Sequence, residues 1–157
     1  MAHASSFEIK NAETFFNEMV LPQYEEFLRN NSSSRYALLT TIMAYHLYEW
    51  VHKKKFTLDK FKAAYPAHTR LAQDFEVARN ITNGTKHFSN KSVTTRTQTG
   101  FSSEFSDEFA RLLIIQYLDG TEISADQFLW KLIEFALLCA ARSPLSKDTE
   151  ALSFERY

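Results

Sequence analysis

The 157-residue chain is predicted to be mainly α, an antiparallel bundle of four to five helices with a small β-hairpin before the last helix. Gly and Pro occur only three times each, and such sparse punctuation favours long helices. Apolar residues recur at helical spacing in four segments. Asp119-Gly120 separates two runs rich in β-branched and aromatic residues, a strong hairpin signal. The length fits one domain over residues 1–157, with 144–157 as a partly ordered tail.

The first helix is expected from about Ala12 to Arg29, with a kink or break near Leu21 because Pro22 lacks an amide hydrogen. Its inward stripe would contain Phe15, Phe16, Met19, Val20, Phe27 and Leu28. Serines at the end of the loop 30–34 can cap a second helix, expected from Arg35 to about Lys54. A short helix over 58–64 follows, opened by Thr57 or Asp59 and stopped by Pro66.

The third long helix is expected to start near Thr69 and to reach at least Asn83. Gly84 can end this helix or be absorbed in it, since glycine costs a helix interior only about 1 kcal/mol relative to alanine. Residues 92–101 alternate β-branched and polar side chains, which predicts an exposed strand. The hairpin strands are expected near 111–118 and 121–124, and Ser124 should cap a last helix over about 125–142.

Charge and cysteine content exclude several classes of protein. The formal net charge is -1, so no overall field recruits nucleic acid or an anionic membrane. Residues 77–103 nevertheless contain four cationic residues and no acid. The single cysteine, Cys139, excludes an internal disulfide or a thiolate metal cluster and is expected to be a buried spectator. No secretory signal, membrane span, phosphate-binding loop or dinucleotide fingerprint is present, so we expect a cytoplasmic protein without cofactor or metal.

The segment "ARNITNGTKHF", residues 78–88, carries the chemistry. If the helix continues through Gly84, residues four apart lie about 40° from each other around the axis, which puts Arg79, Asn83 and His87 on one stripe. A guanidinium can bind phosphate and an imidazole can move a proton near neutral pH. Those groups suit metal-independent RNA cleavage, in which the ribose 2′-hydroxyl attacks its neighbouring phosphate. In the other interpretation Arg79 is a surface ion-pairing residue and Asn83-Gly84 ends the helix, so the same residues are only its polar terminus.

At these residues the chain resembles the HEPN superfamily, helical bundles that include toxin and phage-defence ribonucleases. Arg79 and Asn80 match the Arg-Asn pair of that family, and His87 matches its histidine with a longer spacing. Seven residues lie between Arg79 and His87, whereas active members place the histidine four to six residues after the arginine. The segment "NGTKHF", followed by a strand, an Asp-Gly hairpin and a closing aromatic helix, is similar to uncharacterised bacterial HEPN-like proteins.

The resemblance implies catalytic roles for Arg79, Asn80 and His87, with Asn83 and Lys86 beside them as substrate contacts. It also implies RNA or a nucleotide as ligand, a homodimer with one composite cleft, and an antitoxin protein as a partner. The alternative is a non-catalytic interaction or nucleotide/anion-binding module on the same bundle. The longer Arg-to-His spacing favours that alternative.

Further candidates lie on the second helix. His46 can be a second proton carrier, a metal ligand or a substrate contact, and an antiparallel arrangement could bring it near Asp74 or His87. In the other interpretation it is a core histidine hydrogen-bonded to a neighbour. Lys53, Lys54 and Lys55 can contact a nucleic-acid backbone or simply form a solvated helix end. His52 is expected to be solvated.

Overall fold

The computed structural model describes residues 7–87, 93–97 and 113–142. It has a helical bundle and a small antiparallel sheet before the last helix, which confirms the predicted fold class. The elements are α1 (Ala12–Phe15), the π-helical turn η1 (Phe16–Val20), α2 (Leu21–Arg29), α3 (Ser34–His52), α4 (Leu58–Ala64), α5 (Thr69–His87), β1 (Val93–Thr97), β2 (Leu113–Tyr117), β3 (Glu122–Ser124) and α6 (Ala125–Ala141).

The expected break near Pro22 is a π-helical turn. The amide of Leu21 donates to the carbonyl of Phe16, five residues earlier, and Pro22 then stands in the first turn of α2, where a missing amide hydrogen is tolerated. The helical path thus continues from Ala12 to Arg29 with one wider turn. Two residues of the predicted inward stripe, Met19 and Leu28, are exposed. A regular helix would place both residues inward, but the π turn changes the angular position of the residues along the helical path.

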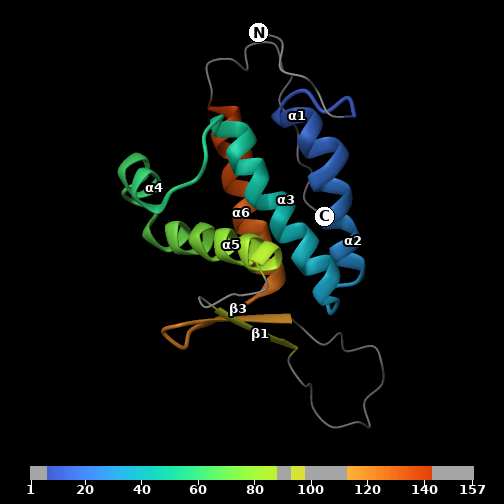
Figure 1. Ribbon diagram of the computed structural model, residues 1–157, viewed down its shortest axis with the longest axis vertical. Helices are drawn as coiled ribbons and strands as arrows, with labels where there is room; N and C mark the ends of the chain where they lie inside the picture. Colours follow the sequence, from blue (N-terminus) through green and yellow to red (C-terminus); the bar gives the residue numbers. More distant parts are fainter. Residues whose placement is uncertain (1–6, 88–92, 98–112, 143–157) are drawn as a thin grey trace.

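Helices α1, η1 and α2 pack antiparallel to α3, while α6 runs in the same direction as α3 (Figure 1). Helix α5 crosses α3 and α6 rather than lying along them, and α4 stands at the side of the bundle (Figure 1). The core is aromatic where α3, α4, α5 and α6 meet. It is built from Tyr48, Phe56, Phe61, Phe75 and Phe135, whose ring centroids lie 4.8–5.9 Å apart.

The sheet order is β1-β2-β3, with both pairs antiparallel. The β2–β3 hairpin turns at Gly120, whose φ of +83° lies in the region that favours glycine. The hairpin prediction is confirmed, and the strand expected in 92–101 pairs with β2, from Val93 opposite Tyr117 to Thr97 opposite Leu113. Ser124 then caps α6 by accepting a hydrogen bond from the Gln127 amide, as predicted.

Candidate nucleic-acid interface

Helix α5 is continuous through Gly84 to His87, so the first of the two helical alternatives is the one observed. Gly84 is buried, and the Thr85 hydroxyl donates to the carbonyl of Ile81 at 2.9 Å, so the glycine lies inside a regular helical turn. Arg79 and Asn83 therefore share one stripe of the helix. The backbone of Lys86 and His87 belongs to α5, but their side chains lie outside the described residues.

Arg79 is held by a carboxylate one turn earlier on the same helix. Its Nε lies 3.0 Å from Glu76 Oε2, and its Nη2 lies 2.5 Å from Glu76 Oε1. This two-pronged hydrogen bond raises the pKa of the Arg79 guanidinium above its ordinary value. Guanidinium has five N–H donors, so an incoming phosphate would share Arg79 with Glu76 or displace that carboxylate.

Glu49 on α3 is the centre of a second group. Its Oε1 accepts from the Tyr45 hydroxyl at 3.1 Å and from the Phe56 amide at 3.2 Å, and its Oε2 lies 3.4 Å from His46 Nδ1. Burial, and then the charge and hydrogen bond of Glu49, raise the pKa of Tyr45 well above its usual range, while the charge of Arg79 acts in the opposite direction. Arg79 therefore lies within electrostatic range of Tyr45.

We call Tyr45, His46 and Glu49 of α3, with Glu76 and Arg79 of α5, the α3–α5 polar seam. Tyr45 links the two helices, because the charges of Glu76 and Arg79 on α5 both act on its hydroxyl. His46 and Arg79 are both partly exposed. Asn80 is half-buried and lies about 100° around α5 from Arg79, while Asn83 is exposed one turn beyond Arg79.

Neither carboxylate of the seam was assigned a role from the sequence. Glu76 lies three residues before Arg79, and Glu49 lies three residues after His46. That spacing is the available signal, because residues three apart meet on a helix surface. The seam thus contains an imidazole and a guanidinium, and each has its own acid within 3.4 Å.

Asp74, the suggested neighbour of His46, is instead fully buried beneath the hairpin. Its Oδ1 accepts a hydrogen bond from the Tyr117 hydroxyl of β2 at 2.5 Å. Arg70 stacks on the Tyr117 ring at 4.1 Å and lies 3.8 Å from Asp74 Oδ1, and it also donates to the Thr121 hydroxyl at 3.3 Å. Asp74 and Tyr117, which are 43 positions apart in the chain, thereby fix the sheet against α5.

His52 is not solvated, contrary to the expectation from its position at a basic helix end. Its Nδ1 lies 2.9 Å from the Tyr48 carbonyl, which can only accept, so Nδ1 carries the proton and Nε2 accepts from the Tyr65 hydroxyl at 2.9 Å. Cys139, half-buried, donates to the oxygen of Tyr65 at 3.5 Å. Burial lowers the pKa of His52 and raises that of Cys139. The group joins the ends of α3, α4 and α6.

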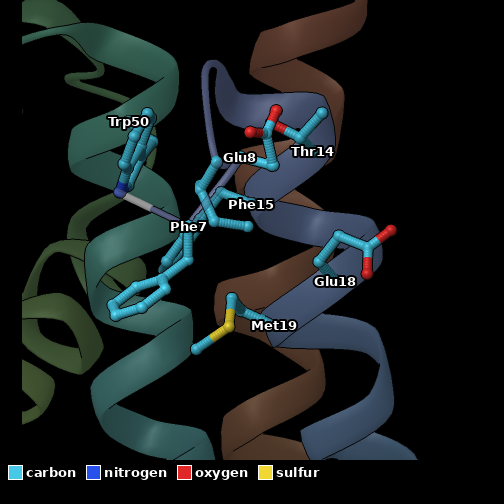
Figure 2. A pocket seen from close by; sticks show the side chains of 8 residues that line it. Phe7, Glu8, Thr14, Phe15, Glu18, Met19 and Trp50 are labelled. Carbon is cyan, nitrogen blue, oxygen red and sulfur yellow. The ribbon is translucent and has the colours of Figure 1, made fainter. Parts of the chain in front are cut away.

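A separate groove of about 870 Å³ lies between the N-terminal segment and the last turns of α3. Its lining residues are Phe7, Glu8, Ile9, Thr14, Phe15, Glu18, Met19 and Trp50. Figure 2 shows the Glu18 carboxylate on the side away from Trp50, and Phe15 stacks on Trp50 with a centroid separation of 5.2 Å. The interior of the groove is thus mainly apolar, and none of the seam residues lines it.

Among residues 7–87, 93–97 and 113–142, no three His, Cys, Asp or Glu side chains are grouped so that they could hold a metal ion. None of the helices in the same part of the chain is long and apolar enough to cross a membrane. No protein-family model matches the chain, and comparison with curated proteins and with solved structures gives no match.

Proposed function

We propose that the chain is an RNA-directed protein of the HEPN type and that the C-terminal half of α5, with the α3–α5 polar seam, meets the phosphate backbone. The observation that carries the proposal is the continuity of α5 through Gly84. A continuous helix fixes the spacing of Arg79, Asn83, Lys86 and His87, which a loop would not do. Residues 77–103 contain no acid, so Lys86 has no acidic neighbour within that run, whereas Arg79 is paired with Glu76 just before it.

The catalytic form of this proposal is a metal-independent endoribonuclease. His87 takes the proton of the ribose 2′-hydroxyl, the 2′-oxygen forms a bond to phosphorus, and the bond from phosphorus to the 5′-oxygen breaks. His46 returns a proton to that leaving oxygen. Arg79 and Asn80 stabilise the extra negative charge of the transition state. The products are a 2′,3′-cyclic phosphate and a free 5′-hydroxyl.

The pairing of Arg79 with Glu76 supports a second candidate, a non-catalytic interaction or nucleotide/anion-binding module. A guanidinium already neutralised by a carboxylate gives less to a developing phosphorane than a free one. In this form α5 keeps a ligand in place without cutting it. The two candidates share the surface and differ in chemistry.

The resemblance to the HEPN superfamily also suggests a homodimer, an antitoxin partner and a cytoplasmic location. Two copies of the chain pair α5 with α5 in a two-fold homodimer, so that one composite cleft holds the RNA. An antitoxin protein would then neutralise the dimer by covering this cleft. The setting is the cytoplasm, where RNA is the available substrate.

The test is cleavage of a labelled RNA by purified protein in the presence of EDTA, with the termini of the products identified. For the catalytic form we expect His87→Ala to abolish cleavage and Arg79→Ala to slow it about 10²- to 10³-fold, the scale for removal of one oxyanion donor. His68→Ala is the matched control, because His68 is an exposed histidine at the start of α5. Equal loss of activity in the control would refute the assignment to His87.

Glu76→Gln separates the two candidates. Removal of the carboxylate frees the guanidinium, so an anion-binding module should bind RNA or a nucleotide more tightly than the wild type. Glu134→Gln, an exposed acid on α6, controls for the change in net charge. Wild-type protein that binds but never cuts RNA, with tighter binding in Glu76→Gln alone, selects the non-catalytic form. Protein that neither binds nor cuts RNA eliminates both.

A further inference from the structure

The turn from α3 into α4 and helix α4 itself carry a dense group of cations. Five lysines are exposed within ten residues, and the same stretch contains a single acid, Asp59. They are Lys53, Lys54, Lys55, Lys60 and Lys62, which we call the lysine surface. The chain as a whole has a formal net charge of -1, so this surface is a local excess of positive charge.

The lysine surface is not neutralised within the described residues. In that part of the chain no carboxylate lies within ion-pair distance of any of its five ammonium groups, whereas Lys10 and Arg29 elsewhere have acid partners at 3.1 and 3.5 Å. The charge of Lys54 is also felt at His52, whose pKa is lowered first by burial and further by this lysine. The positive field therefore extends over the end of α3.

Two buried aromatic residues hold the lysines together. Phe56 follows Lys55 directly, and Phe61 stands between Lys60 and Lys62 in the sequence. The rings of Phe56 and Phe61 pack with their centroids 5.8 Å apart. The loop and the helix are thus anchored to one another through the core, which keeps their flanking lysines on a common support. Figure 1 shows α4 standing at the side of the bundle, where a long ligand can reach it.

The position of the lysine surface relates it to the α3–α5 polar seam. The amide of Phe56 donates to Glu49 Oε1 at 3.2 Å, so Lys55 lies next in sequence to a residue that contacts the seam. Glu49 in turn lies 3.4 Å from His46. A polyanion that lies along the lysines would therefore pass beside the residues proposed to act on phosphate.

We propose that the lysine surface binds the phosphate backbone of RNA and guides the strand toward the α3–α5 polar seam. The choice of RNA over another phosphate polymer rests on the proposed function. Phosphate contacts require positive charge without a fixed geometry, and lysine supplies a point charge on a flexible stem. The large apolar side chains of this segment, Phe56 and Phe61, are buried at 4% and 1% exposure, so they are not available to insert into a lipid surface.

The experiment measures the affinity of the full chain for a 2′-O-methyl RNA oligonucleotide, which lacks the attacking hydroxyl and cannot be cut by the proposed chemistry. The test variant is Lys54→Gln, Lys55→Gln, Lys60→Gln and Lys62→Gln together. The matched control neutralises four cations on other elements, namely Lys10→Gln, Arg29→Gln, Arg35→Gln and Lys131→Gln. Both variants lower the net charge equally, and circular dichroism verifies that each is folded. Lys53 is left unchanged because its φ of +53° makes it part of the C-cap of α3.

The slope of log K against log salt concentration should fall by about 0.7 for each lost phosphate contact, up to about 2.8 for four. We expect this fall and at least a tenfold loss of affinity at about 100 mM salt in the test variant, with at most a small change in the control. Equal effects in the two variants, or no effect in either, would overturn the proposal. So would binding of anionic lipid vesicles but not of RNA.

Failure of the proposed function gives a different result. If the protein binds RNA through the lysine surface but neither cuts it nor responds to Glu76→Gln, the seam has no role and the lysine surface remains. If the protein cuts RNA at the seam and the lysine variant binds and cuts as well as the wild type, the seam remains and the lysine surface is excluded.

Discussion

Replacing Tyr117 by phenylalanine isolates the hydrogen bond that fixes the hairpin to α5. Tyr117 is 7% exposed and Asp74 is fully buried, so water cannot take over the lost partner. Within the described residues, Asp74 Oδ2 has no hydrogen-bond donor. After the substitution Oδ1 keeps only the guanidinium of Arg70, at 3.8 Å.

The expected cost follows from that arrangement. A hydrogen bond to a charged group contributes about 1.5–3 kcal/mol, and loss of one partner of a buried ion costs more than loss of the pair together. The change also removes one oxygen from a packed site without leaving a large cavity. We therefore expect Tyr117→Phe to lower the free energy of unfolding by about 2–3 kcal/mol.

The assay is urea denaturation followed by circular dichroism, arranged as a double-mutant cycle with Asp74→Asn. The double variant should be less destabilised than the sum of the single variants, with a coupling of about 1.5–3 kcal/mol. Tyr36→Phe is the control, because no hydrogen bond involves its hydroxyl in the described residues. A loss below about 0.5 kcal/mol for Tyr117→Phe, the range of an ordinary surface change, would refute the reasoning.

Three more predictions concern titration, the turn and association. Burial lowers the pKa of His52 in the folded state. The contribution of His52 to stability is therefore complete above the unfolded-state pKa of about 6.5 and is lost as the pH falls toward the folded-state pKa. Urea midpoints should decline from pH 7 to 5 more steeply in the wild type than in His52→Gln. Gly120→Ala should cost about 1–2 kcal/mol in the same assay, since an added Cβ meets no atom within 4 Å but the φ of +83° strains an L-residue; an unchanged midpoint would contradict this. Light scattering should give a dimer at micromolar concentration, and a mass of 18.2 kDa throughout would refute the proposed composite cleft.

Local signals in the sequence were sufficient where the physical cause is itself local. Thr57 and Pro66 bracket α4, and Ser124 caps α6, so those helices could be placed from the caps alone. Gly84 left two alternatives open in the sequence, a helix end or a tolerated interior residue, and the second is observed. Its cost of about 1 kcal/mol is small beside the packing of a long helix. The π turn before Pro22 was predicted only as a break, since several backbone adjustments can satisfy the missing amide hydrogen.

Long-range partners were the part that the sequence could not provide. Nothing in the order of residues pairs Asp74 with Tyr117, 43 positions later, or places Phe56 so that its amide donates to Glu49. The expectation that His52 is solvated was wrong for the same reason. Its basic neighbours are adjacent in the chain, whereas the Tyr65 hydroxyl that buries and binds its ring comes from α4 through tertiary packing.

In the proposed function the residues that bind RNA tightly are different from the residues that act on its phosphate. Among the described residues the lysines have no acid partner, whereas the residues of the α3–α5 polar seam do. Arg79 and His46 each face a carboxylate, so the α3–α5 polar seam by itself attracts a phosphate weakly. The lysine surface has no acid within ion-pair distance in the described residues and lies one residue along the chain from Phe56, which contacts the seam. Binding energy from the remote lysines can then offset the cost of breaking the Arg79–Glu76 pair so that a phosphate takes the place of Glu76. A free nucleotide does not reach the lysines and would not drive this exchange. On the proposed function we therefore predict that a polymer with several phosphates binds the chain more tightly than a mononucleotide does; equal affinity for a mononucleotide would favour the nucleotide-binding candidate instead.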